Sequence, residues 1–272
     1  MPADPTPAPD FSTCPRGRLA AVAGVLTDID DTLTRDGAIE PAAREALAAL
    51  RAAHVPVIAV TGRPKGWSEP FARDWPIDAI VAENGAVALF MQGHRLRVEY
   101  VQDEATRRIH RSRLDAAAAR VLREVPEATL ARDSAGRVTD IAIDHAEFAH
   151  LSRVQVERVV AIMRDEGMTA TVSSIHVNGW FGDHDKRSGS RWIVQRLLGR
   201  DLERERERWL YVGDSTNDQA MFAAHPLSVG VANLLDFRDQ LDVWPAFLTQ
   251  GERGAGFAQV AQALIDARRL AE

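Results

Sequence analysis

A buried strand followed at once by a cluster of acids occupies residues 22–32, which read VAGVLTDIDDT. The run Val22–Thr27 is apolar without alternation, which is typical of a strand covered on both faces of a sheet. Asp28, Asp30 and Asp31 follow it directly. Two carboxylates about 4 Å apart repel by roughly 4 kcal/mol at an effective dielectric constant near 20, and a bound cation would relieve that repulsion. Because ligands bind beyond the carboxyl ends of strands in open α/β sheets, the stretch predicts a cation site, and oxygen ligands suit Mg²⁺.

The chain on either side of this stretch alternates strands and helices. Residues 42–53 are rich in helix formers, and Val55–Val60 and Ala79–Val81 are further apolar runs. The same pattern returns after Ser188, with strands expected at Trp209–Val212 and Leu227–Val231. Such β–α–β alternation favours a parallel sheet with right-handed crossovers, so we predict an α/β fold with a Rossmann-like core.

The segment between these two parts has a different pattern. Ala86–Phe90 and Arg95–Val101 predict a hairpin, and apolar residues at helical spacing predict two helices. Helices followed by hairpin strands indicate an α+β module. We therefore predict a core of residues 19–91 and 184–272, interrupted by an inserted cap domain of residues 92–183. Further strands are expected in the cap at Thr129–Arg132, Arg137–Ile143 and Thr169–Val177.

The composition of the 272 residues, with 46% hydrophobic and 26% charged, is that of a chain able to bury a core. The net charge of −6 disfavours a broad surface for nucleic acid or anionic lipid. No apolar run approaches the roughly 18 residues needed to span a bilayer. Residues 1–18 are proline-rich, which predicts a disordered tail, and lack the long apolar run of a signal peptide. The single cysteine, Cys14, cannot form an internal disulfide, and we expect a cytoplasmic protein whose oligomeric state is open.

Three further short motifs carry chemistry. A second acidic turn, Gly213-Asp214-Ser215-Thr216-Asn217-Asp218, follows an expected strand and adds two carboxylates. Thr61-Gly62-Arg63-Pro64 follows another strand, where a hydroxyl and backbone N–H groups are suited to cradle a phosphate. Of the 33 basic residues only Lys65 and Lys186 are lysines, and Lys186 stands where the α/β pattern resumes. A compact ammonium supplies a point charge among crowded oxygens, which a planar guanidinium does less readily.

Together these motifs resemble those of the haloacid dehalogenase superfamily of phosphohydrolases. Four occur in the family's order: Asp28-x-Asp30-x-Thr32, Thr61, Lys186 and Gly213-Asp214-x-x-Asn217-Asp218. An insert between the second and third motifs is similar to the type IIB branch, which has C2 caps, and so is Glu83-Asn84-Gly85. The resemblance covers the core, whereas the cap matches in position and general style. Asp31 departs from the pattern, because many relatives have glycine there.

The resemblance implies a role for each motif residue. Asp28 would attack phosphorus to form an aspartyl-phosphate, and Asp30 would protonate the leaving oxygen and then activate water. Mg²⁺ would be held by Asp28, the backbone carbonyl of Asp30, and Asp214, with Asp218 in support. The groups that would bind the phosphoryl oxygens belong to Thr61, Gly62, Lys186 and Asn217.

The end of the insert carries polar side chains that suit a sugar. His176, Asn178 and Trp180, together with Glu83 and Asn84, are candidates for contact with substrate, although His176 and Trp180 fit a structural role as well. We expect a Mg²⁺-dependent phosphatase that acts on a small phosphorylated metabolite, with a sugar phosphate as the expected substrate. A cap of this kind would close over the site and exclude water.

Three other functions are compatible with parts of this pattern. A phosphomutase would pass the phosphoryl group to a second hydroxyl of a sugar phosphate. A phospho-accepting signalling module also combines Asp, Thr and Lys around Mg²⁺, but the Asp28-x-Asp30 spacing and the long insert count against it. A catalytically silent binding protein is disfavoured by the intact motifs, and a dehalogenase by Asp30, which halide displacement does not need.

Overall fold

The computed structural model describes residues 8–270, which divide into two compact units. The first unit comprises the residues up to Ala59, Trp75–Asp78 and the residues from Val194 onward. The second comprises Val60–Asp74 and Ala79–Ile193. The predicted cap of residues 92–183 lies wholly within the second unit, which also takes in segments that we assigned to the core. The domain boundaries given above therefore stay a prediction.

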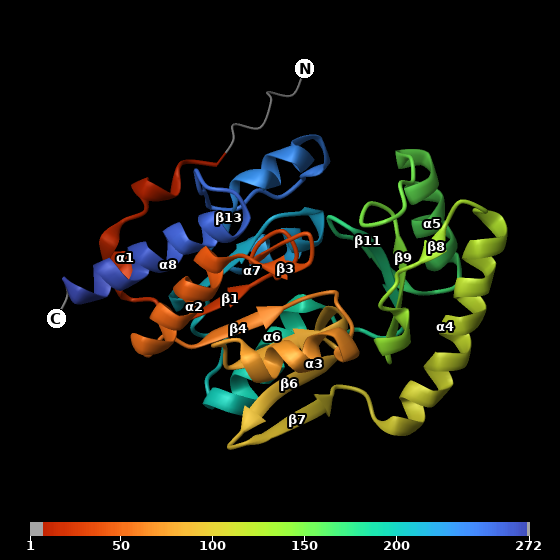
Figure 1. Ribbon diagram of the computed structural model, residues 1–272, viewed down its shortest axis with the longest axis horizontal. Helices are drawn as coiled ribbons and strands as arrows, with labels where there is room; N and C mark the ends of the chain where they lie inside the picture. The colour runs from red at the N-terminus through yellow and green to blue at the C-terminus, as the bar shows by residue number, and fades with distance from the viewer. Residues whose placement is uncertain (1–7, 271–272) are drawn as a thin grey trace. The chain divides into compact units, whose positions relative to one another are not determined.

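A parallel sheet forms the centre of the first unit (Figure 1). Its strands β1 (Gly24–Thr27), β4 (Val57–Val60), β12 (Trp209–Gly213), β13 (Leu227–Gly230) and β14 (Phe247–Leu248) lie in the order β14-β13-β12-β1-β4. All neighbouring pairs in this row are parallel. Strand β1 is buried along its whole length, as its unbroken apolar run predicts. The prediction of an α/β fold with a largely parallel sheet is confirmed.

Helices and short loops complete the first unit. Helix α2 begins at Pro41, a residue preorganised for the first helical turn, and buries Leu47 and Leu50. Figure 1 shows α2 (Pro41–Ala52) and α8 (Arg253–Arg269) side by side, and the two helices are in contact. The remaining elements are η1 (Phe11–Thr13), α1 (Arg16–Ala20), β2 (Thr34–Arg35), β3 (Ala38–Ile39), α2 (Pro41–Ala52), η4 (Arg206–Arg208), η5 (Thr216–Asp218), α7 (Gln219–Ala224), η6 (Ala232–Gln240) and α8 (Arg253–Arg269).

The second unit contains two sets of antiparallel strands. Strands β5 (Ala79–Ala82), β6 (Val87–Gln92) and β7 (Arg95–Tyr100) pair in sequence order, which confirms the predicted hairpin. A separate sheet has the order β10-β11-β9-β8. Its strands and the remaining elements are α3 (Lys65–Asp74), η2 (Glu83–Gly85), α4 (Glu104–Glu124), β8 (Thr129–Leu130), η3 (Ser134–Gly136), β9 (Asp140–Asp144), α5 (Arg153–Asp165), β10 (Thr169–Val172), β11 (His176–Trp180) and α6 (Lys186–Leu198), the last of which ends in the first unit.

The four-stranded sheet has one apolar and one polar face, because side chains alternate along a strand. Ile141 and Ile143 of β9 belong to a buried cluster with Leu114 and Val121 of α4 and Ile162 of α5. Figure 1 shows these two helices beside β8 and β9. The opposite face carries the alternate residues of β9 and β11, which are paired as Asp144 with His176, Ala142 with Asn178, and Asp140 with Trp180.

Two sequence predictions need correction. The segment Thr169–Val177 is not one strand, because the Ser173 hydroxyl accepts the His176 N–H at 3.0 Å and closes a turn that separates β10 from β11. The disordered tail does not reach residue 18, because Phe11 is buried against Phe247 and the Pro9 carbonyl accepts the Leu248 N–H. Apolar contact with β14 outweighs the low hydrophobicity of this segment, and residues 1–7 lie outside the described part of the chain.

Candidate active site

Three buried carboxylates meet at the carboxyl ends of β1 and β12 in the first unit. Ligand oxygens of Asp28, Asp214 and Asp218 all lie within 4.8 Å of one another. The register explains this, because Thr27 pairs with Val212 and the Asp28 N–H donates to the Val212 carbonyl at 2.9 Å. Asp30 stands in the turn that follows, where it is partly exposed.

Asp218 is fixed by neighbours in the same loop. One of its oxygens accepts the Tyr211 hydroxyl at 2.5 Å, and the other accepts the N–H groups of Asp214 and Ser215 at 2.9 and 3.1 Å. Gly213 permits this arrangement, because a Cβ there would lie 2.5 Å from an oxygen of Asp218. Asp214 accepts the Thr32 hydroxyl at 3.1 Å, which joins the two acidic turns. These contacts favour a supporting role for Asp218 and a ligand role for Asp28 and Asp214.

The electrostatics of the cluster fit a divalent cation. Burial, and after it the negative charges of Asp218, Asp28 and Asp214, raise the pKa of the Tyr211 hydroxyl well above its usual value. The tyrosine therefore stays neutral and donates its proton to Asp218. Close buried carboxylates of this kind are stabilised by a hard cation with oxygen ligands, the donor set that Mg²⁺ prefers.

Asp31 occupies a left-handed backbone conformation, with φ of 53°, which glycine would adopt without strain. Its carboxylate binds the guanidinium of Arg253 at 2.8 Å, and its carbonyl accepts the Asn233 side chain at 3.0 Å. Asn233 in turn accepts the Arg253 N–H at 2.9 Å. This closed ring ties the turn that bears Asp28 to the start of α8.

We expect Asp31→Gly to leave the free energy of unfolding near that of the wild type and Asp31→Ala to lower it. Both variants lose the ion pair, but only alanine retains the left-handed strain, which costs about 1 kcal/mol or more. Urea denaturation of the two variants measures the difference. Equal midpoints for Asp31→Gly and Asp31→Ala would contradict the prediction.

The second unit holds the turn proposed to bind phosphate. The Thr61 N–H donates to the Val81 carbonyl at 2.8 Å, and the Thr61 carbonyl accepts the Asn84 N–H at 3.0 Å. The Arg63 N–H donates to the Thr61 hydroxyl oxygen at 3.0 Å, so the hydroxyl proton can point away from its own turn. A Cβ on Gly62 would lie 3.2 Å from the Asn178 side chain and 3.3 Å from the Asn84 side chain, so these amides would have to shift by a few tenths of an ångström.

Glu83, Asn84 and Gly85 connect this turn to Lys186. Gly85 has φ of 109°, and a Cβ on it would overlap the backbone of Asp185, the residue before Lys186. Lys186 itself is buried at the start of α6. The structure thus brings Thr61, Gly62, Asn84 and Lys186 to one set of connected turns, while Asp28, Asp214, Asn217 and Asp218 share the acidic turns of the first unit.

The candidate substrate residues of the insert are largely engaged by protein groups. The His176 ring lies 3.0 Å from Glu147, and the Asn178 amide donates to Asp140 at 3.2 Å. Trp180 is 1% exposed and donates its indole N–H to the His184 carbonyl. Glu83 is fully buried and accepts backbone N–H groups. Direct contact of these residues with a substrate stays a prediction.

His184 makes the stability depend on pH. Burial lowers the pKa of its ring to about 4 from the usual 6.5. Between those values the unfolded chain binds a proton that the folded chain does not, so stability falls as the pH decreases from about 6.5 to 4. The loss reaches about 3 kcal/mol at most. We expect His184→Gln to flatten this part of the pH profile of urea denaturation and the exposed control His94→Gln to leave it unchanged.

A second group of possible metal ligands, Asp144, Glu147 and His176, lies in the second unit. Its negative charge is already balanced by Arg63, whose guanidinium binds Glu147 at 2.8 Å and Asp133 at 3.2 Å. Burial opposes ionisation of Glu147, but hydrogen bonds from His176 and Arg63 lower its pKa to about 2. This group therefore has less need of a cation than the cluster around Asp28.

Sequence reasoning missed the polar face of the insert. Arg63, Asp133, Arg137, Asp140 and Glu147 form buried ion pairs there. The signal was present in residues 140–144, where Asp140, Ala142 and Asp144 alternate with two isoleucines and mark a strand with one apolar face and one face that bears charges. The sequence indicated no function for Lys65. In the structure it forms an ion pair with Glu69, one helical turn along α3, at 2.6 Å.

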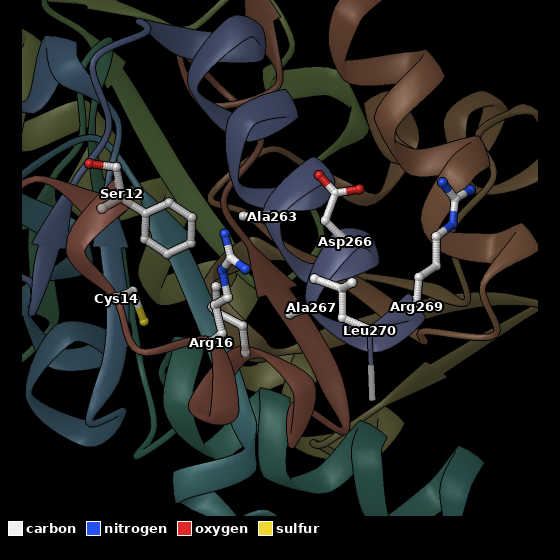
Figure 2. A pocket seen from close by; sticks show the side chains of 10 residues that line it. Ser12, Cys14, Arg16, Ala263, Asp266, Ala267, Arg269 and Leu270 are labelled. Atoms are coloured by element: carbon white, nitrogen blue, oxygen red, sulfur yellow. The ribbon is translucent and has the colours of Figure 1, made fainter. Parts of the chain in front are cut away.

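A pocket of about 510 Å³ lies away from these residues, in the first unit (Figure 2). Figure 2 shows Ala263 and Ala267 of α8 and Leu270 just after it along the pocket, with Cys14 and Arg16 on the facing segment. None of the predicted site residues lines it. Among residues 8–270, no helix has the length and apolarity that a membrane span requires.

Comparison with known proteins identifies the fold. Residues 25–131 match the family model of the haloacid dehalogenase-like hydrolases, whereas no curated protein sequence matches the chain. A Thermoplasma acidophilum protein superposes with a TM-score of 0.68 at 16% identity, over 89% of this chain and 98% of its own. A HAD/COF-like hydrolase from Plasmodium vivax gives 0.67 at 16% identity, over 92% and 99%. The sucrose-phosphatase of Synechocystis, in complex with sucrose and phosphate, gives 0.63 at 15%, over 89% and 98%.

These identities are low, so the solved structures establish the fold. The family match covers β1 with its acidic turn and the Thr61–Arg63 turn, which are two of the motifs quoted from the sequence. The carboxylate cluster lies beyond the carboxyl ends of β1 and β12, where open α/β sheets bind their ligands. Residues 25–131 are thus similar to the haloacid dehalogenase-like hydrolases, and the chain has a fold similar to that of the solved structures named above.

Proposed function

We propose that the protein is a phosphatase that hydrolyses a small phosphorylated metabolite through an aspartyl-phosphate on Asp28. The observation that supports this most directly is the buried cluster of Asp28, Asp214 and Asp218 beyond the ends of two parallel strands. The family match and the sucrose-phosphatase fold point the same way.

The proposed steps assign one task to each residue. A carboxylate oxygen of Asp28 forms a bond to phosphorus while the bond to the leaving oxygen breaks, and Asp30 gives that oxygen its proton. Asp30 then takes a proton from water, whose oxygen forms a bond to phosphorus while the bond between phosphorus and the Asp28 oxygen breaks, so that phosphate leaves and the Asp28 carboxylate is restored. Developing negative charge on the phosphoryl oxygens is balanced by Lys186, the Thr61 hydroxyl and the N–H groups near Gly62, with Asn217 in support.

Mg²⁺ is the proposed cofactor. Asp28 and Asp214 would hold it together with the Asp30 carbonyl, and Asp218 would keep the Asp214 loop in place through its hydrogen bonds. When bound, the ion would offset the repulsion among the carboxylates and polarise the phosphoryl group.

A sugar phosphate is the proposed substrate class. The sucrose-phosphatase of similar fold was solved with sucrose and phosphate, and the insert presents polar side chains next to the Gly62 turn. We assign the chain to the type IIB branch on the position of this insert. The single cysteine supports a cytoplasmic location, and the net charge of −6 supports a small-molecule substrate over nucleic acid or a membrane.

The test is a phosphate-release assay over sugar and non-sugar monoesters, with Mg²⁺ and with a chelator. We expect release that depends on Mg²⁺, is fastest with a sugar phosphate, and returns when Mg²⁺ is restored after chelation. Transfer to an added sugar in place of release would favour the phosphomutase. An aspartyl-phosphate that persists without turnover would favour the signalling module.

A further inference from the structure

Arg137 joins the insert to the Thr61–Arg63 turn within the second unit. Its side chain is 1% exposed, and one terminal nitrogen donates to the Gly62 carbonyl at 2.8 Å. The same nitrogen contacts both oxygens of Asp140 at 2.8 and 3.0 Å, and the rest of the guanidinium faces Asp133 at 3.2 Å. The Asn178 amide approaches the same carbonyl at 3.4 Å.

A buried ion pair such as that of Arg137 with Asp140 contributes little net free energy to the stability of a fold. Taking two charges out of water costs free energy that their attraction repays only in part, and apolar residues of similar volume often stabilise as well. Burial raises the pKa of Asp140 even with Arg137 beside it, so ionisation of this carboxylate is unfavourable there. Stability alone therefore does not explain why an arginine is buried at this position.

The peptide unit between Gly62 and Arg63 supplies that reason. Its carbonyl is held by Arg137, and its N–H donates to the Thr61 hydroxyl oxygen at 3.0 Å. Because a peptide unit is planar, fixing the oxygen fixes the direction of the N–H as well. Because the Arg63 N–H occupies one lone pair of the Thr61 hydroxyl oxygen, the hydroxyl proton points in another direction. Through this one rigid plane, Arg137 can set the direction in which Thr61 donates.

We propose that Arg137 is a positioning residue that orients the Thr61 hydroxyl for a phosphoryl oxygen. The proposal rests on the proposed phosphatase function and adds a residue of the insert to it. Arg137 does not touch the phosphoryl group in this scheme; it acts through the Gly62 carbonyl. Loss of the guanidinium lets the peptide plane rotate, so that binding of phosphate and of the transition state weaken together.

A pocket of about 400 Å³ gives access to Arg137 within the second unit. Arg111, Ser134, Arg137 and Asp140 line it, with apolar walls from Ala118 and Ile141. Truncation of Arg137 would extend this space to the position of the lost guanidinium. Added guanidinium ion can then enter and donate to the Gly62 carbonyl and Asp140, which makes chemical rescue a direct test.

The experiment compares the wild type with Arg137→Ala and with Arg137→Met/Asp140→Asn, which removes both charges and keeps an acceptor for Asn178. We expect kcat/KM to fall at least about tenfold in both variants and the inhibition constant of inorganic phosphate to rise by a similar factor. Millimolar guanidinium chloride should restore the kcat/KM of Arg137→Ala in a saturable manner. The rescue should be absent in the wild type, in Thr61→Ala and with tetramethylammonium chloride.

Phosphate binding is also measured by calorimetry, which needs no turnover. A wild type that releases no phosphate from any monoester would refute the proposed function, while the calorimetric comparison still tests Arg137. A folded double variant with unchanged kcat/KM and unchanged phosphate affinity would overturn the proposal. If Arg137→Ala does not fold, the double variant alone decides.

Discussion

Asp28→Asn is expected to lower phosphate release by at least about 10⁴-fold while the protein stays folded. The amide has nearly the shape of the carboxylate, so the buried site at the end of β1 can accept it. The amide is a poor nucleophile, however, and the aspartyl-phosphate cannot form. The assay is phosphate release from the best substrate of the screen, with Mg²⁺ at saturation.

The stability of the same variant gives an independent check on the carboxylate cluster. Asp28 lies within 4.8 Å of Asp214 and Asp218, so removing its charge relieves repulsion when no cation is bound. We expect metal-free Asp28→Asn to unfold at the temperature of the metal-free wild type or above it. We also expect Mg²⁺ to raise the unfolding temperature of the variant by less, because a ligand oxygen has been lost.

Asp36→Asn is the matched control for both measurements. Asp36 is exposed and stands in a left-handed conformation that asparagine tolerates. It should keep wild-type turnover and the wild-type response to Mg²⁺. Wild-type turnover in Asp28→Asn would show that the assigned nucleophile is wrong.

The parts of the fold that local pattern determines were predictable. An unbroken apolar run predicted buried β1, and the turn Gln92-Gly93-His94 between two strand-like runs predicted the hairpin of β6 and β7. The acidic turns at Asp28 and Asp214 could be placed together, because parallel neighbours end at the same edge of a sheet.

The parts that depend on contacts between distant segments were not predictable. Phe11 is buried by β14, which lies more than two hundred residues along the chain, and no local pattern indicates that contact. Arg137 has the sequence surroundings of a surface arginine, and only the fold brings it to the Gly62 carbonyl. Buried charges of this kind are identified by their partners, and the partners are set by topology.

The role of Glu83 also depends on contacts between distant segments. Substitution of this residue is expected to have a large effect on the free energy of unfolding. The sequence suggests a substrate contact, but its fully buried carboxylate accepts the N–H groups of Lys65 and Val138 with one oxygen, at 3.0 and 3.1 Å. The other oxygen accepts the Thr139 N–H at 2.6 Å and the Thr139 hydroxyl at 2.5 Å. One side chain therefore satisfies the backbone of two segments that are far apart in sequence.

Glu83→Gln is expected to lower the free energy of unfolding by about 3–5 kcal/mol. Whichever way the amide turns, its NH₂ group faces backbone donors, so at least one buried N–H loses its acceptor and another meets a donor. Charge-assisted hydrogen bonds to the carboxylate are lost as well, each of them stronger than a neutral bond. Urea denaturation gives the magnitude, and hydrogen exchange at the Thr139 amide shows whether the loss is local.

Glu69→Gln is the matched control, because Glu69 undergoes the same substitution at a partly exposed position. It breaks the ion pair with Lys65 on α3, a pair of the kind that contributes about 0.5 kcal/mol or less. The difference in the free energy of unfolding between the two variants compares two kinds of carboxylate. Glu83 is buried and accepts backbone N–H groups, whereas Glu69 is partly exposed and pairs with a lysine. If Glu83→Gln lowers the free energy of unfolding by no more than Glu69→Gln, the Glu83 carboxylate does not hold these segments together. The turn that contains Glu83 would then be held by the packing of Gly85 against α6.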